Sequence, residues 1–204
     1  LMMSVQNVFS PAHGGPVISP TQDMVLGLYY LTFTRPGMVG EGKSFGSAQE
    51  AILAYDMGKI HIHAQISVRF TGSRTVYTTR GQAEQLSNFR LKTTVGRVLL
   101  NETLPKEMPY FNYEMDKKSI QDVIMRCHRL CGKNATLKLL DDLKETGFRY
   151  ATRAGISFSK ADMTIPPEKD QIIKETLERV EKIEKNYQRG ALTPGERYNQ
   201  IIDE

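Results

Sequence analysis

The segment at residues 10–30 limits the fold most strongly, because it joins a loop rich in proline and glycine to an apolar helix. Three prolines and two adjacent glycines precede Thr21, and each proline ring fixes the backbone φ angle. The Thr21 hydroxyl can accept a hydrogen bond from the free amides of a following helix. We therefore predict a rigid elbow and a helix that begins at Gln22, with Thr21 as its N-cap.

A short helix and a small antiparallel β hairpin are predicted next. Ser47 and Glu50 have the spacing of a capping box, and Gly58 is well placed to end the helix. Apolar side chains then occupy every second position over residues 60–70, which is the period of a half-buried strand. A tight turn would bring residues 75–79 back as the second strand of the hairpin.

The middle of the chain changes from mixed to helical periodicity. Residues 81–90 are polar and poor in large aliphatic side chains, which predicts a surface loop or an insertion. Residues 93–101 fit a strand or a short helix equally well. From Asp116 the apolar spacing becomes helical, and Gly132 and Gly147 are predicted to end two successive helices. The first apolar stripe consists of Ile120, Val123, Ile124, Cys127, Leu130 and Cys131.

The last forty residues predict a helical hairpin that projects from the body. Pro166 and Pro167 are expected to open the longest helix, since proline is tolerated in a first turn. Gly190 would break that helix, and residues 196–203 would return antiparallel to it as a coiled coil. Apolar residues recur every three or four positions at Ile173, Leu177, Val180, Ile183 and Tyr187, and ion pairs are predicted for Glu175/Arg179, Glu178/Lys182 and Glu181/Lys185. The fold class is therefore α+β and mostly helical.

Composition excludes several classes of protein. The chain has 204 residues and a net charge of +4, and its basic residues are dispersed, so charge alone is a weak argument for nucleic-acid binding. No apolar run approaches the roughly 18 residues that a membrane helix needs, and no signal peptide can be assembled at the start. With two cysteines only, Cys127 and Cys131, reduced thiols and a cytoplasmic location are expected.

Both ends of the sequence lie within a helical pattern. An apolar pattern is already under way at Leu1, Met2 and Met3, and Ile201 and Ile202 have only begun to form a helical face near the other end. We therefore expect this chain to be an internal piece of a larger polypeptide, whose activity need not reside here.

Two pairs of side chains have the chemistry of metal ligands. His61 and His63 would point to the same side of the predicted strand, but zinc requires at least a third protein ligand and none is identifiable nearby. Cys127 and Cys131 share a helical face, but the intervening His128 points elsewhere. The cysteines are predicted to be small core residues, and no metal site is predicted.

Five blocks of the sequence match one known family. They are residues 10–30, Thr93-Thr94-Val95-Gly96-Arg97, Gly147-Phe148-Arg149-Tyr150-Ala151-Thr152-Arg153-Ala154-Gly155-Ile156, Asp162-Met163-Thr164-Ile165-Pro166-Pro167-Glu168-Lys169 and Gly195-Glu196-Arg197-Tyr198-Asn199. Through them the chain resembles the β′ subunit of bacterial DNA-directed RNA polymerase over nearly all its length. The resemblance is weakest at residues 33–46 and 72–90.

The resemblance implies one part of a nucleotidyltransferase. That family joins nucleoside triphosphates (NTPs) into RNA on a DNA template by two-metal phosphoryl transfer. The resemblance places its magnesium-binding aspartate loop and its zinc sites outside this chain, so no catalytic residue and no cofactor is expected here. It implies a pore-like domain at residues 1–110, a helical funnel domain at 111–165 and a rim hairpin at 166–204. These domains would wall the secondary channel, through which NTPs enter and backtracked RNA leaves.

The resemblance also suggests contact residues. Gln22, Lys117 and Lys118 match pore positions near the nucleotide and the RNA 3′ end, although both lysines can equally be solvated first-turn residues. Other polymerase subunits are implied partners, and Gre-type transcript-cleavage factors would grip the rim. The candidate rim contacts are Leu192, Glu196, Tyr198, Asn199 and Asp203.

Local structural roles compete with these rim assignments. Tyr198 can pack against the first helix of the hairpin, and Glu196 can cap the second. Some family members bind a guanosine tetraphosphate alarmone at this rim through a lysine, but Gln200 occupies that position here. Two other functions stay open from the residues: a free-standing coiled-coil adaptor that docks proteins, and a metal-dependent enzyme centred on His61 and His63.

Overall fold

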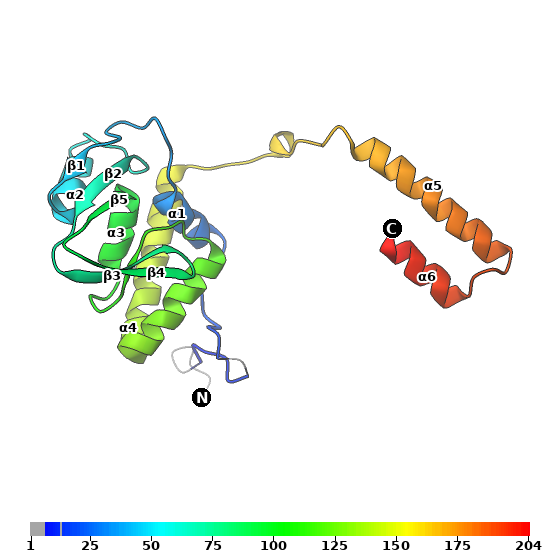
Figure 1. Cartoon of the computed structure of the whole chain (residues 1–204), viewed down its shortest axis with the longest axis horizontal. Coiled ribbons are helices and arrows are strands. Elements are labelled where there is room, and N and C mark those ends of the chain that lie inside the picture. Colours follow the sequence, from blue (N-terminus) through cyan, green and yellow to red (C-terminus); the bar gives the residue numbers. More distant parts are fainter. Residues whose placement is uncertain (1–6, 13) are drawn as a thin grey trace. The chain divides into compact units, whose positions relative to one another are not determined.

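A computed structural model describes residues 7–12 and 14–204 of the chain. The apolar pattern noted at Leu1–Met3 lies outside these described residues. The chain divides into two compact units, Leu1–Ile156 and Ser157–Glu204, and each is described by itself (Figure 1). In chain order the elements are α1 (Asp23–Thr32), β1 (Ser44–Phe45), α2 (Ala48–Asp56), β2 (Gln65–Arg69), β3 (Ser73–Thr79), β4 (Gln82–Ser87), β5 (Arg90–Thr94), α3 (Val95–Thr103), β6 (Tyr110–Phe111), α4 (Lys117–Ala154), the 3-10 helix η2 (Lys160–Asp162), α5 (Lys169–Gln188) and α6 (Pro194–Asp203).

Two small three-stranded sheets, together with helices over about half of the described residues, confirm the α+β class. The first sheet has the order β1-β2-β5, with β2 parallel to β1 and antiparallel to β5. The second has the order β4-β3-β6, with β3 antiparallel to β4 and parallel to β6. The helix predicted after Ser47 is present as α2, and the Ser47 side chain accepts a hydrogen bond from the Glu50 amide.

The antiparallel hairpin predicted between residues 60–70 and 75–79 does not form. Strand β2 covers only residues 65–69, and it pairs with β1 and β5 rather than with β3. Gly72, with a φ of 83°, lies between β2 and β3, where the chain leaves the first sheet and enters the second. Alternation reports which side chains are buried, but it does not report which strand supplies the hydrogen bonds.

The loop predicted at residues 81–90 was also wrong, because residues 82–87 form β4 and pair antiparallel with β3. Nearly every β4 side chain is exposed, so the sequence lacks the apolar alternation that would predict a strand. Residues 93–101 contain both a strand end and a short helix. Strand β5 ends at Thr94, and α3 begins at Val95. The Thr94 side chain caps α3 by accepting a hydrogen bond from the Arg97 amide.

Helix α4 begins where the sequence predicts and ends later. Asp116 is its N-cap and accepts a hydrogen bond from the Ser119 amide at 2.6 Å. Gly132 has non-helical angles, which divide α4 into two helical segments. Gly147 does not end the second segment, which continues to the left-handed Gly155. The first predicted stripe is buried as far as Cys127, but Leu130, just before the break, is 60% exposed.

Three glycines let α1 lie in backbone contact with its neighbours. A Cβ atom on Gly27 would lie 1.8 Å from the Gly147 carbonyl oxygen of α4, and one on Gly96 would lie 1.7 Å from the Leu31 carbonyl oxygen. Both distances are far below van der Waals contact, so only glycine fits. Gly147 is therefore a packing residue rather than a helix stop. Leu28 and Leu31 of α1 are fully buried in the largest hydrophobic cluster.

The N-terminus of α1 differs from the predicted cap. Gln22, with a φ of 49°, is the N-cap, and no side chain caps the helix. Thr21 contributes its backbone carbonyl, which accepts a hydrogen bond from the Met24 amide at 3.1 Å. The preceding elbow is closed by a bridge between Phe9 and Pro16.

The second unit contains the predicted pair of antiparallel helices. Arg197 of α6 contacts Glu184 at 3.1 Å and Arg179 of α5 contacts Glu204 at 2.9 Å, which fixes the antiparallel pairing. The coiled coil covers only part of α5, because Leu177 is 62% exposed. Of the three ion pairs predicted along α5, the structure shows Glu181 with Lys185 at 2.8 Å.

The expectation that the two prolines open the longest helix was wrong in both respects. Helix α5 has 20 residues and α4 has 38. Pro166 and Pro167 precede the α5 N-cap, Glu168, and the Pro166 carbonyl accepts a hydrogen bond from the Lys169 amide in a turn. Within the described residues, no helix combines the length and the apolar character that a membrane span requires.

Candidate functional site

The tip of the α5–α6 hairpin is shaped by local hydrogen bonds. Gly190 takes a left-handed φ of 74° directly after α5. Thr193 and Glu196 then form a capping box, in which a Glu196 carboxylate oxygen accepts hydrogen bonds from the Thr193 amide at 2.8 Å and from its hydroxyl at 2.7 Å. These two bonds lower the pKa of Glu196. The capping role weighed for Glu196 is confirmed, and Leu192 is half-buried beside it.

The five candidate rim residues do not share one surface. On α6, Glu196, Asn199 and Asp203 lie three and four positions apart and therefore follow one helical face. Tyr198 points elsewhere and is 64% exposed, so it does not pack against α5. The structure therefore offers an acidic face on α6, and Tyr198 stands apart from it.

Arg197 holds the two helices together, a role that the sequence analysis missed. Its guanidinium lies 4.8 Å from the centre of the Tyr187 ring and forms the ion pair with Glu184. The available signal was the placement of an aromatic and an acidic residue three positions apart on the facing helix, which together suit a guanidinium.

The three candidate pore residues do not converge either. Lys117 and Lys118 are exposed in the first turn of α4. The C-terminal end of α1 lies near that turn, since the Thr32 hydroxyl accepts a hydrogen bond from the Met115 amide at 2.9 Å. Gln22 caps the opposite end of α1, and ten helical residues separate the ends by about 15 Å.

His61 and His63 precede β2 instead of lying on a strand. Their ring centres are 5.0 Å apart, and His63 is buried. Burial, assisted by the neighbouring His61, lowers the pKa of His63, so this ring is neutral near pH 7. No group of three or more His, Cys, Asp or Glu side chains within the described part of the chain could hold a metal ion.

Cys127 is buried and Cys131 is partly buried on α4, and both are free thiols. Burial is the main cause that raises the pKa of Cys127 to about 11. Because the thiolate is the reactive form of cysteine, Cys127 should be inert. At pH 8 we expect iodoacetamide to modify Cys131 at least about tenfold faster than Cys127, measured by peptide mass spectrometry. In urea the two rates should converge, whereas equal rates in the folded chain would contradict the burial.

The same shift makes stability depend on pH. Unfolding returns Cys127 to its ordinary pKa of 9.0, so the unfolded chain loses this proton at a lower pH than the folded chain, whose value is about 11. The contribution to stability is complete below pH 9 and is lost as the pH rises toward 11. The free energy of unfolding should therefore fall more steeply over this range in the natural chain than in Cys127→Ala.

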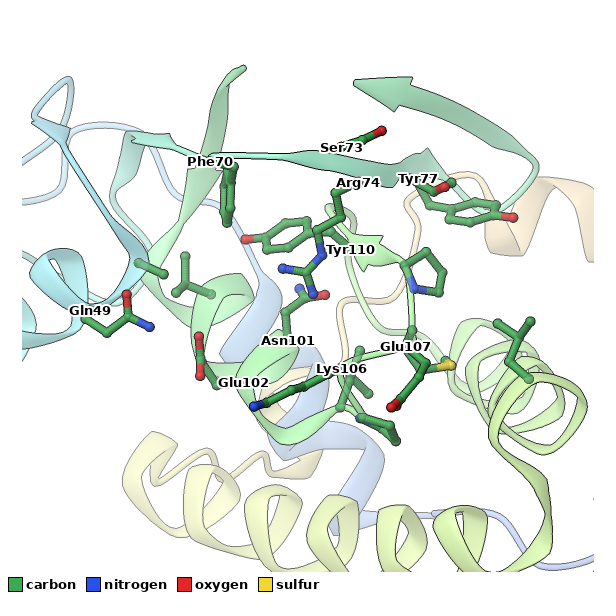
Figure 2. A pocket seen from close by; sticks show the side chains of 18 residues that line it. Gln49, Phe70, Ser73, Arg74, Tyr77, Asn101, Glu102, Lys106, Glu107 and Tyr110 are labelled. Carbon is green, nitrogen blue, oxygen red and sulfur yellow. The ribbon is translucent and has the colours of Figure 1, made fainter. Parts of the chain in front are cut away.

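A pocket of about 930 Å³ opens between β3, α3 and the loop before β6. Figure 2 shows the Arg74 side chain pointing from β3 into this pocket, above Asn101 of α3. The Arg74 guanidinium lies 5.4 Å from the centre of the buried Tyr110 ring. Two cations and two carboxylates line the pocket, so its formal charge is balanced: Arg74, Lys106, Glu102 and Glu107.

Comparison with known proteins identifies the family of this chain. The model for RNA polymerase Rpb1, domain 3, matches residues 7–163, which span the first unit and η2. The chain belongs to this Rpb1 domain 3 family. The family match ends before α5, so the helical hairpin lies beyond it.

Whole-chain relatives extend over both units. A DNA-directed RNA polymerase subunit beta′ from Pelotomaculum thermopropionicum is 43% identical over 99% of the chain. Proteins of the same name from Syntrophobacter fumaroxidans and Parabacteroides distasonis are 44% and 43% identical over 100% of it. The chain spans 14% to 16% of the length of these relatives. It therefore corresponds to an internal part of the β′ subunit, as the resemblance predicted.

The Rpb1 domain 3 unit also reveals a connecting residue that sequence reasoning missed. Arg97, from the Thr-Thr-Val-Gly-Arg block, donates hydrogen bonds to the carbonyls of Thr32 at 3.0 Å and Asn112 at 3.1 Å. It therefore ties the end of α1 to the segment that leads into α4. The two residues that Arg97 joins lie 65 and 15 positions away from it in the chain. A local sequence pattern therefore could not predict that Arg97 connects these segments.

Proposed function

We propose that this chain is the part of a bacterial RNA polymerase β′ subunit that lines the secondary channel and docks the factors that enter it. Residues 1–110 would form the pore, 111–165 the funnel and 166–204 the rim. In the assembled enzyme this region would meet NTPs, DNA and RNA, and other polymerase subunits. The observation that carries the proposal is the similarity to β′ relatives over both units, including the hairpin.

The proposal gives the chain a positioning role and no chemistry. RNA synthesis would use magnesium held by aspartates elsewhere in the subunit, zinc sites would also lie elsewhere, and the chain alone would be inactive. The exposed ammonium groups of Lys117 and Lys118 would attract the phosphates of NTPs or of a backtracked RNA end by Coulomb steering. Gln22, at the other end of α1, would contact a different part of the passage. The similarity to polymerase subunits favours this function over a free-standing coiled-coil adaptor or a His61/His63 metalloenzyme.

The hairpin tip supplies the surface for a channel factor. Leu192 offers an apolar side chain between the two helix ends, and the acidic face of Glu196, Asn199 and Asp203 lies on α6 next to it. A compact apolar contact surrounded by charge is typical of a protein interface, in which a few residues supply most of the affinity. Tyr198, exposed on another side of α6, would extend the contact only if the factor wraps around the helix.

A binding experiment with a Gre-type factor tests the rim assignment. We expect Leu192→Asp to weaken binding at least about tenfold, because it places a charge in the apolar centre of the interface. The combined variant Leu192→Asp with Glu196→Lys should abolish binding, but it also destroys the capping box. Glu196→Gln preserves the capping geometry and removes only the charge, so it separates the two effects. Affinity would be measured by biolayer interferometry with the immobilised factor.

Ile165→Asp is the matched control for this experiment, because Ile165 is an exposed apolar residue outside the hairpin. It should bind the factor like the natural chain. Circular dichroism should show that Leu192→Asp retains its helices. Equal affinity of the natural chain and Leu192→Asp would refute the rim assignment.

A further inference from the structure

A second, smaller pocket lies among residues that the proposed function does not use. Its volume is about 430 Å³, within the range of small-molecule sites. Three tyrosines from different helices line it: Tyr30 of α1, Tyr55 of α2 and Tyr150 of α4. Tyr30 and Tyr150 come from two of the blocks that carry the family resemblance. Three helices therefore each contribute a tyrosine side chain to the lining of this pocket.

The charge of this pocket is one-sided. Arg153 lines it, and no aspartate or glutamate does. The Arg153 guanidinium donates a hydrogen bond to the Tyr55 hydroxyl at 3.4 Å and lies 5.5 Å from the centre of the Tyr150 ring. Across the described residues, Arg153 forms no ion pair within 4.0 Å. No carboxylate in direct contact therefore neutralises its positive charge. In the pocket of Figure 2, by contrast, two carboxylates balance two cations.

The remaining polar groups of the pocket can donate hydrogen bonds. The Nδ1 atom of His61 accepts a hydrogen bond from the His63 amide at 3.2 Å, which leaves Nε2 as the donor atom of that ring. Burial raises the pKa of Tyr150, which keeps its hydroxyl protonated. Because the Tyr55 hydroxyl accepts from Arg153, its own proton is available to a ligand.

We propose that this pocket binds a planar aromatic molecule that carries a phosphate or carboxylate group. The aromatic ring would stack against the tyrosine rings, whose faces favour offset or edge contacts. The anionic group would pair with Arg153, since guanidinium matches both phosphate and carboxylate geometry. The inference rests on the lining of the pocket and does not depend on the channel function.

A titration with adenosine 5′-monophosphate (AMP) tests the proposal, because AMP combines a planar ring with a phosphate. Binding to the 204-residue chain would be followed by nuclear magnetic resonance (NMR) of tyrosine ring signals. We expect saturable shifts of the Tyr30, Tyr55 and Tyr150 rings. Adenosine, which lacks the charge, and inorganic phosphate, which lacks the ring, should each bind at least about tenfold more weakly than AMP, since each loses one of the two contacts.

Two variants assign the binding to this pocket. Arg153→Gln should weaken AMP binding at least about tenfold, because it removes the cation and keeps a polar side chain. Arg149→Gln makes the same change one turn earlier on α4, where Arg149 lines a different pocket, and should leave the affinity unchanged. Tyr55→Leu, which removes a ring and a hydroxyl, should weaken binding independently of Arg153.

Several results would overturn the proposal. They are the absence of saturable shifts with AMP, equal binding of phosphate or adenosine, and equal loss of affinity in Arg149→Gln and Arg153→Gln. Thermal unfolding of Arg153→Gln, an exposed position, should match that of the natural chain, so that a lost affinity reports the site and not the fold.

Discussion

Gly96→Ala is expected to lower the free energy of unfolding by about 3 kcal/mol or more. The added methyl group would lie 1.7 Å from the Leu31 carbonyl oxygen and 2.8 Å from its carbonyl carbon. These are backbone atoms of α1, so no side-chain rotation can relieve the overlap, and α1 must move away from α3. Because α1 carries fully buried Leu28 and Leu31 into the main hydrophobic cluster, its displacement would disturb the core of the first unit. Urea unfolding followed by circular dichroism measures the change.

Gly27→Ala tests a second backbone contact of α1, the one with α4. Its methyl group would lie 1.8 Å from the Gly147 carbonyl oxygen of α4, and we expect a loss of similar size. Gly81→Ala is the control, because nothing lies within 4 Å of its added Cβ and its φ is not left-handed. It should change the stability by no more than about 0.5 kcal/mol. If Gly96→Ala behaved like Gly81→Ala, the close packing of α1 would be refuted.

Asn101→Leu is expected to cost about 3 kcal/mol of stability, because it leaves two buried backbone groups without partners. The Asn101 side chain donates to the Phe111 carbonyl at 2.9 Å and accepts from the Phe111 amide at 2.8 Å. It also donates to the Arg97 carbonyl at 2.8 Å. Leucine has a similar size and no hydrogen-bonding group, so the variant isolates the polar contribution. Both Asn101 and Phe111 are buried, so water cannot replace the lost bonds.

The control for this prediction is Asn112→Ala. Asn112 donates a side-chain hydrogen bond to the Lys92 carbonyl at 2.9 Å in an exposed setting, so its loss should cost less than about 1 kcal/mol. Chemical denaturation of both variants gives the comparison. A cost for Asn101→Leu no larger than that for Asn112→Ala would show that Asn101 does not join α3 to β6. That connection also places Tyr110 in the pocket of Figure 2.

Local capping chemistry was predictable because the partners are three residues apart. Ser47 caps α2 and Glu196 completes the capping box of α6, as their sequences indicate. The cap of α1 was not predicted correctly. The composition of the preceding segment indicates a rigid turn, but the Thr21 hydroxyl does not cap the helix. A side-chain cap depends on the residue type, its rotamer and the local backbone angles, and the sequence specifies only the first directly.

The candidate contact residues were predicted as single positions and not as a site. Resemblance to the β′ subunit identified the residues, but their relative placement depends on helix length and phase. Gln22 and Lys117 therefore lie at opposite ends of α1, and Tyr198 lies off the acidic face of α6. Arg153 could not be recognised from the sequence as part of the proposed binding pocket. It lines that pocket together with Tyr55, its hydrogen-bond partner, which lies 98 positions away.

The sequence by itself determined the α+β class, the caps of α2 and α6 and the antiparallel hairpin after Pro167, since each depends on spacing within a few residues. The family was identified by the resemblance of whole sequence blocks. Only the tertiary structure decided that β2 and β3 belong to different sheets, that polar residues 82–87 form a strand and that Gly147 packs against α1 instead of ending a helix. The physical reason is that strand pairing and backbone contact are formed between residues far apart in the chain, and glycine has no side chain whose pattern could reveal which of its roles applies.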